Sequence, residues 1–231
     1  MKFVSVLFLL LSSVLLHAQD AKSLLRNVNK KFLAVNDYKA AVFMKFNIPG
    51  VKIKNMNGQV MYKRPNKFRV KANGIFFLPK QNPMQNMSQI LMDTNAYTAV
   101  FSGNEVVQGM ACAVVNLVPL QSNNEIILGR FWIDSKSALV LKSQITTKNN
   151  GTIETENRFG ALGKYALPDR MLITVEVAKI KVPKMLAADL NKKSTDKSTA
   201  TNTREKGTIE LLLSDYKLNQ KLSDAEFVET Q

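Results

Sequence analysis

The chain of 231 residues contains a single histidine, His17, and a single cysteine, Cys112. One cysteine cannot form an intramolecular disulfide, which excludes a disulfide framework. Ser-His-Asp and Cys-His catalysis need a histidine, and so does a histidine-ligated metal site, whereas His17 lies in a segment that we expect to be removed. The sequence therefore predicts no cofactor, no metal and no enzymatic activity. A hydrolase that uses two carboxylates is the catalytic alternative left open, although no motif brings two acidic residues together.

The chain also lacks an apolar run of the roughly 20 residues that a transmembrane helix needs. Its longest run, Phe3 to Leu16, follows Lys2 and is followed by Ala18. A short positive segment, an apolar run of this length and a nearby small residue are typical of a cleaved secretory signal peptide. We therefore expect residues 1–18 to be removed and residues 19–231 to form one exported domain, with a retained membrane anchor as the alternative.

Acidic residues are scarce relative to basic ones. The chain has 32 lysines and arginines against 18 aspartates and glutamates, which gives a formal net charge of +14. A basic balance suggests nucleic acid or an anionic membrane surface as a partner. Export argues against nucleic acid, and so does the absence of an arginine-rich helix or an aromatic RNA-binding motif. A simply solvated basic surface and one that meets an anionic surface or an acidic partner both remain open.

Alternation of apolar and polar residues dominates the rest of the chain and predicts strands. It is clear at 41–48, 139–146, 171–177 and 209–214, and turn signals such as Asn149-Asn150-Gly151 separate the segments. About nine to eleven short strands with turns between neighbours favour a single antiparallel sheet, strongly curved or nearly closed. The expected fold is mainly β (α+β): an incomplete antiparallel β-barrel with short helices as a lid or plug.

Three segments show helical rather than alternating spacing. Asp20 to Ala34 is an amphipathic helix in this interpretation, and shorter helices are expected at 82–91 and 183–190. The two short segments contain Met84, Met87 and Met185. Methionine suits a surface that adapts to varied ligands, so either a lid or ordinary packing on the sheet would explain them. Residues 191–206 are rich in Lys, Ser, Thr and Asn and predict a flexible loop.

Several short motifs, taken in order, resemble the periplasmic outer-membrane lipoprotein carrier family (LolA-like). The most characteristic is Arg64-Pro65-Asn66 followed by Phe68, after a helix and a first strand. The later motifs are Gly103–Gly109 before Cys112–Pro119, Phe131–Asp134, Leu167-Pro168, Asp215–Asn219 and the segment from Leu222 to Phe227. The resemblance covers nearly all of the chain after the signal segment.

This resemblance implies an incomplete barrel whose helices cover an apolar cavity that holds acyl chains. It implies a carrier or chaperone in the periplasm of a Gram-negative type envelope, delivering acylated lipoproteins or lipids towards the outer membrane. The implied partners are an inner-membrane extractor and an outer-membrane acceptor, with transient membrane contact by a monomer. The segment from Ala72 to Leu91 departs from the family pattern. A regulatory binding module of the same fold, such as an envelope-stress sensor, is therefore the alternative.

The resemblance also implies a role for Arg64, which would hydrogen-bond to the lid and keep it closed. A solvated arginine before a turn is the alternative. Ten apolar residues are candidates for lining the cavity, although the same residues could equally fill a solid core. They are Phe43, Met44, Phe46, Phe68, Met84, Met87, Ile90, Leu91, Met185 and Leu186. Cys112 and Trp132 are expected to be buried core residues.

Overall fold

The computed structural model describes residues 21–50, 52–72, 95–121, 125–148, 151–176 and 205–228. A helix occupies residues 21–33. The strands that follow are β1 (Asp37–Asn47), β2 (Met56–Lys63), β3 (Lys67–Ala72), β4 (Tyr97–Val107), β5 (Met110–Pro119), β6 (Ile126–Asp134), β7 (Leu139–Thr147), β8 (Gly151–Arg158), β9 (Arg170–Glu176) and β10 (Lys206–Leu218). Two 3-10 helices are η1 (Ala161–Tyr165) and η3 (Asp224–Phe227).

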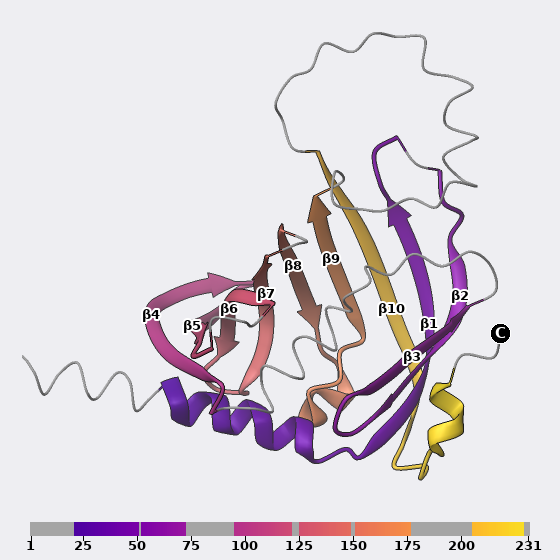
Figure 1. Cartoon of the computed structure of the whole chain (residues 1–231), viewed down its shortest axis with the longest axis horizontal. Helices are drawn as coiled ribbons and strands as arrows, with labels where there is room; N and C mark the ends of the chain where they lie inside the picture. Colours follow the sequence, from indigo (N-terminus) through magenta and orange to yellow (C-terminus); the bar gives the residue numbers. More distant parts are fainter. Residues whose placement is uncertain are drawn as a thin grey trace, which may run out of the picture.

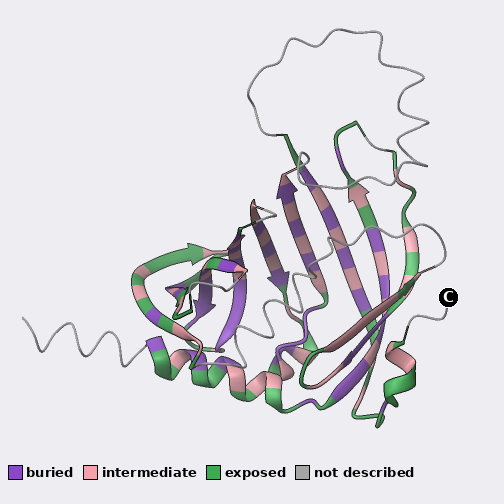
Figure 2. Ribbon diagram, in the orientation of Figure 1, coloured by how far each residue is buried: buried purple, intermediate pink, exposed green. Residues whose placement is uncertain are grey.

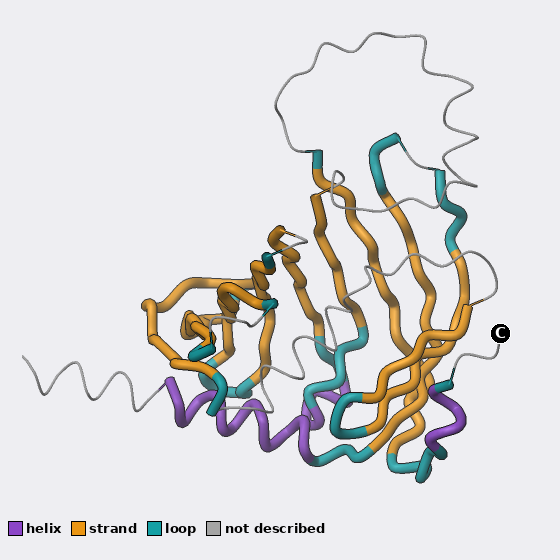
Figure 3. The backbone as a smooth tube through the Cα atoms, viewed as in Figure 1, coloured by secondary structure: helices purple, strands orange, loops and turns teal. Residues whose placement is uncertain are grey.

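All ten of these strands form one antiparallel sheet. Their order is β3-β2-β1-β10-β9-β8-β7-β6-β5-β4, so β10 from the end of the chain pairs with β1 from its beginning. Val42 of β1 lies opposite Leu213 of β10. The sheet curves strongly without closing, which leaves β3 and β4 at its two ends (Figures 1 and 3). The expected incomplete antiparallel β-barrel is confirmed.

One face of this sheet is apolar along its whole width. In β1 the side chains of Val42 and Met44 are buried, whereas Lys45 is exposed, as strand alternation requires. Ile145 of β7 lies opposite Ile153 of β8, and these residues belong to two different buried clusters. Because directly opposed residues share a face, the two clusters lie on the same inner face.

The helix at 21–33 packs its apolar side against one half of this inner face. Ala21, Leu25 and Val28 are buried at helical spacing and join the cluster that contains Val115 and Phe131 of β5 and β6. The helix runs beneath β4 to β7 and leads into β1 (Figure 1). Exposed residues recur along the helix (Figure 2). The amphipathic helix expected from Leu25 and Val28 is confirmed over the described residues.

On the outer face, ion pairs join neighbouring strands from β7 to β10 and β1. Glu210 accepts from Arg170 and pairs with Lys45 at 3.2 Å. Near β5 and β6 this face is also buried, by a cluster that includes Cys112 and Trp132. Both are therefore core residues, as expected.

Parts of the sequence interpretation fall outside the described residues. Neither of the short helices expected at 82–91 and 183–190 can be compared, nor can most of the loop expected at 191–206. The end of that loop is corrected, because Lys206 already pairs with Glu176 as the first residue of β10. Among the described residues, no helix has the length and apolar character needed to cross a bilayer.

Candidate functional site

Several described connections lie at one end of the sheet, which we name the helix end. β1 begins there directly after the helix, β2 and β3 meet there at residues 64–66, and β8 and β9 are joined there by residues 159–169. β10 also ends there, because it runs antiparallel to β1. Four segments that are far apart in the chain therefore meet where the helix ends.

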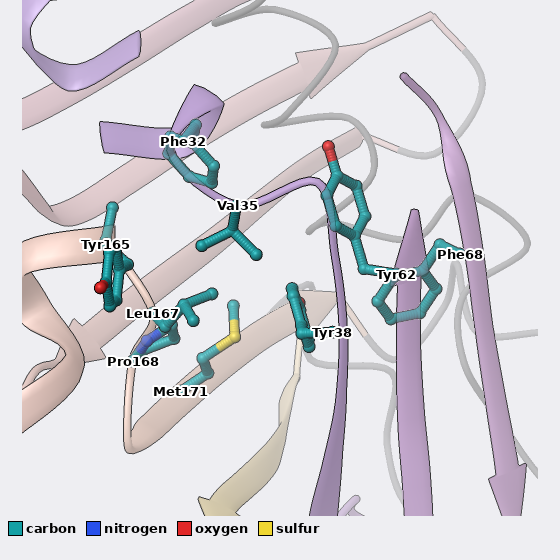
Figure 4. A pocket seen from close by; sticks show the side chains of 10 residues that line it. Phe32, Val35, Tyr38, Tyr62, Phe68, Tyr165, Leu167, Pro168 and Met171 are labelled. Carbon is teal, nitrogen blue, oxygen red and sulfur yellow. The ribbon is translucent and has the colours of Figure 1, made fainter. Parts of the chain in front are cut away.

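A pocket lies at the helix end, against the inner face of the sheet. Its cavity volume is about 30 Å³, which is room for about two water molecules. Figure 4 shows Phe32 and Val35 entering from the end of the helix, with Met171 of β9 across the pocket. The lining consists of Phe32, Val35, Tyr38, Tyr62, Phe68, Tyr165, Ala166, Leu167, Pro168 and Met171. All ten are apolar or aromatic, and none carries a formal charge.

Aromatic side chains form a row across four neighbouring strands beside this pocket. The ring of Tyr38 on β1 lies 5.4 Å from that of Tyr62 on β2 and 5.5 Å from that of Tyr216 on β10. Phe68 on β3 extends the row, since it lies directly opposite Tyr62. Tilted aromatic pairs at these distances stabilise each other beyond the area that they bury.

The tyrosines of this row are neutral at physiological pH. Burial raises the pKa of Tyr62 to about 12, although the nearby Arg64 guanidinium opposes this rise. Burial also raises the pKa of Tyr38 and of Tyr216, because the phenolate would lose its hydration. The Tyr216 hydroxyl donates a hydrogen bond of 2.7 Å to the Pro168 carbonyl, which ties β10 to the segment before β9. The pocket wall is thus held in place without placing a charge in the pocket.

Arg64 ties the end of the helix to the turn between β2 and β3. Its Nη1 donates to the backbone carbonyl of Leu33 at 3.0 Å, and its Nη2 donates to the side-chain oxygen of Asn36. Its backbone N–H donates to the Asn36 carbonyl at 2.8 Å. A helix leaves its last carbonyls without partners inside the helix, and a cation is favoured at that end. Arg64 supplies both a hydrogen-bond donor and a positive charge at this end of the helix, next to Phe32 and Val35 of the pocket.

Asp37 fixes the start of β1 at the same end. Its side chain is buried and accepts backbone hydrogen bonds from Gln220 at 2.7 Å and Lys221 at 3.1 Å. The neighbouring Asn36 N–H donates to the Asn219 side chain at 2.8 Å. The short segment between helix and β1 is therefore held by the turn after β10 as well as by Arg64.

The described cavity candidates fall into two groups. Met44 is buried in the inner-face cluster, Phe46 and Phe68 pack against that cluster, and Phe68 also lines the pocket. The prediction for Phe43 is wrong, because strand alternation places it on the outer face, where the ammonium group of Lys45 lies 6.0 Å from its ring. The other candidates lie outside the described residues: Met84, Met87, Ile90, Leu91, Met185 and Leu186.

Most of the pocket lining was missed by sequence reasoning. Tyr38 and Tyr62 lie in strands that the sequence predicted only in part, and their shared face depends on the register between β1 and β2. Leu167-Pro168 was noted only as part of the family resemblance. The signal that could have found them is the position of each residue at the helix end of its strand. Among the described residues, no group of three or more potential metal ligands comes together.

Several solved structures share the fold of this chain. The chain resembles a protein domain from Vibrio parahaemolyticus assigned to outer membrane lipoprotein sorting, with a TM-score of 0.60, 12% identity and coverage of 91% of this chain and 97% of that one. A LolA superfamily protein from Nitrosomonas europaea matches with a TM-score of 0.55 and 14% identity, over 90% of this chain and 97% of the other. A DUF1329 family protein from Desulfovibrio piger matches with a TM-score of 0.56 and 12% identity, over 92% of this chain and 97% of the other.

No protein-family profile matches the chain, and no curated protein matches it in sequence. The likeness to solved structures is therefore one of fold, and the LolA-like fold expected from the sequence is confirmed.

Proposed function

We propose that this LolA-like chain binds the acyl chains of lipoproteins or lipids in the pocket at the helix end, as a periplasmic carrier that delivers them towards the outer membrane. The observation that carries the proposal is the uncharged lining of the pocket, which aromatic and aliphatic side chains from three stretches of the chain, 32–38, 62–68 and 165–171, build together. Ligand sites are mostly lined by apolar and aromatic side chains.

The chemistry of the lining suits a hydrocarbon chain better than a polar ligand. Tyr38, Tyr62 and Phe68 present ring faces and edges, and Met171 of β9 adds an adaptable thioether side chain on the same sheet, next to Tyr38. An alkyl chain gains free energy from leaving water without needing hydrogen-bond partners in the site. A charged or strongly polar ligand would find no matching charge on this wall.

The cavity is smaller than an acyl chain, so binding requires the pocket to widen. The segment most suited to move is the end of the helix, because Phe32 and Val35 line the pocket while Arg64 holds Leu33 and Asn36 by a few hydrogen bonds. Releasing hydrogen bonds to a half-exposed arginine has a modest cost, since water replaces the lost partners. The lid-contact role implied for Arg64 by the family resemblance fits this arrangement and is part of the proposal.

A fluorescent fatty acid titrated into the purified chain tests the proposal. Saturable binding is expected, and Phe68→Gln should weaken it about tenfold, because complete burial of a phenylalanine side chain contributes roughly 1.5–3 kcal/mol and Phe68 is partly buried in the pocket wall. The matched control is Phe43→Gln, which alters the same residue type on the outer face and should leave the affinity within about twofold of the parent. Equal losses in both variants, or no saturable binding by the parent, would contradict the pocket assignment.

The carrier role needs a second measurement. Acylated lipoprotein should be released from inner-membrane vesicles into a soluble complex with the chain and should then pass to outer-membrane vesicles. Binding of the fatty acid without any transfer of lipoprotein would favour a binding module with a regulatory task instead.

A further inference from the structure

The exposed side of the helix carries only basic and neutral residues. Lys22, Arg26 and Lys30 are all exposed and recur every four residues, which places them along one line of the helix surface. We name these three residues the basic stripe. The segment 21–33 contains no aspartate or glutamate. Among the described residues, no ion pair involves a member of the stripe.

The stripe is not explained by the stability of the helix. Like charges four residues apart repel each other along a helix. Lys30 near the end of the helix is favoured by the helix dipole, but Lys22 in the first turn is opposed by it. Basic residues on the outer face of the sheet are instead neutralised by acidic partners, since Lys45 and Arg170 both pair with Glu210 there. An anionic surface outside the molecule would relieve the repulsion that the helix itself leaves uncompensated.

The other side of the helix makes the stripe a rigidly held surface. Ala21, Leu25 and Val28 are buried against β5 to β7, and Arg64 fixes the last turn at Leu33. The stripe is therefore carried by an ordered helix, so docking does not have to order a flexible backbone segment. Leu33, with 44% of its surface exposed, continues the same helix at the end where the pocket lies.

We propose that the basic stripe docks the chain on the anionic headgroups of a phospholipid membrane. Basic residues close to an anionic bilayer contribute favourably one by one, and a helix that lies along the surface brings all three to the headgroups together. Such docking sets the helix parallel to the membrane, with Leu33 exposed at its end. It thus brings the end of the helix that lines the pocket, at Phe32 and Val35, close to the membrane that holds the acyl chains.

Co-sedimentation with vesicles tests the proposal. The chain should bind vesicles that contain phosphatidylglycerol, should not bind pure phosphatidylcholine vesicles, and should dissociate as salt is raised, because salt screens exposed charges. The triple variant Lys22→Gln, Arg26→Gln, Lys30→Gln should lose about 100-fold in partition, since each basic residue near the surface is worth about fivefold.

The matched control removes three other exposed lysines at the opposite end of the sheet, through Lys52→Gln, Lys54→Gln and Lys206→Gln. It changes the net charge by the same amount and should retain binding within about fivefold. Equal loss in both triple variants would reduce the effect to overall charge and overturn the proposal. The proposal would also be overturned if the parent chain did not bind anionic vesicles but needed its basic stripe to bind an acidic protein.

Fatty-acid binding in the absence of vesicles separates this inference from the proposed function. The stripe variant should bind the fluorescent fatty acid as the parent does, since none of its three residues lines the pocket. If the parent chain binds anionic vesicles but no fatty acid, the membrane-docking role of the stripe stands and the acyl-chain role of the pocket is wrong. If it binds the fatty acid but no anionic vesicles, only the docking role of the stripe is wrong.

Discussion

The guanidinium group of Arg64 donates a hydrogen bond of 3.0 Å to the backbone carbonyl of Leu33, the last residue of the helix. These two residues are far apart in the chain, and their contact joins the helix to the turn between β2 and β3. The same side chain reaches Asn36, so one residue holds both the end of the helix and the segment that leads into β1. The pocket lies beside this contact.

Replacing Arg64 should loosen the helix end without unfolding the sheet. Arg64→Leu removes its side-chain donors, and we expect a loss of about 1 kcal/mol in the free energy of unfolding, since water satisfies the exposed acceptors in part. Hydrogen exchange should accelerate at the amides of residues 29–36 more than in β9 or β10. Arg26→Leu, which alters an exposed arginine of the same helix, is the control. Unchanged exchange in Arg64→Leu would show that the contact does not hold the helix.

Tyr62 gives a pH dependence whose sign follows from its burial. Its pKa is raised from 10.0 to about 12 by loss of hydration, with Arg64 opposing the rise. A group whose pKa is higher in the folded chain stabilises the fold fully below its unfolded pKa. That contribution is lost as the pH rises from about 10 through about 12.

Alkaline titration followed by tyrosinate absorbance checks this expectation. The parent should show a step near pH 12 that Tyr62→Phe removes, and Arg64→Leu should move the step to higher pH. A Tyr62 that titrates at its ordinary value in the folded protein would mean that water reaches the pocket freely.

Asp37 should be important for the junction between the helix and β1. Asp37→Asn removes the charge and replaces one acceptor oxygen by an amide donor, which cannot accept the backbone hydrogen bond from Gln220 or Lys221 that the lost oxygen accepted. We expect a loss of about 2 kcal/mol in the free energy of unfolding, measured by urea denaturation. Asp215→Asn changes an exposed aspartate of β10 and should have little effect. Similar losses in the two variants would argue against a special role for Asp37.

Gly58 should tolerate no side chain in β2. A Cβ atom there would lie 2.6 Å from the Lys71 carbonyl oxygen and 3.2 Å from the Met44 methyl group. Gly58→Ala must therefore push β3 away or displace Met44, and we expect a cost of about 1–3 kcal/mol by thermal or urea unfolding. Gln59→Ala, at the exposed neighbouring position, is the control. An unchanged stability in Gly58→Ala would mean that β3 moves away freely at this point.

Patterns confined to neighbouring residues predicted much of the fold. The helical spacing of Leu25 and Val28 identified the helix, and strand alternation identified β1, β7, β9 and β10. Arg64-Pro65-Asn66 marked the turn between β2 and β3. These predictions succeed because backbone periodicity and turn chemistry act over a few residues, which the sequence presents directly.

The pocket was predicted far less well. Phe43 and Phe68 are equally apolar in the sequence, yet the first lies on the outer face and the second lines the pocket. The choice between them depends on the register of β1 with β2 and β10 and on the turn that places β3 beside Tyr62. Residue type alone carries none of this information.

The sequence by itself thus determined the kind of fold, the burial of Cys112 and Trp132, and the excess of basic residues. The tertiary structure decided which residues meet: it paired β1 with β10, set Arg64 against Leu33 and turned the basic stripe of the helix outward. The physical reason is that burial and charge contact depend on distances through space, and these are set only when distant segments of the chain pack together.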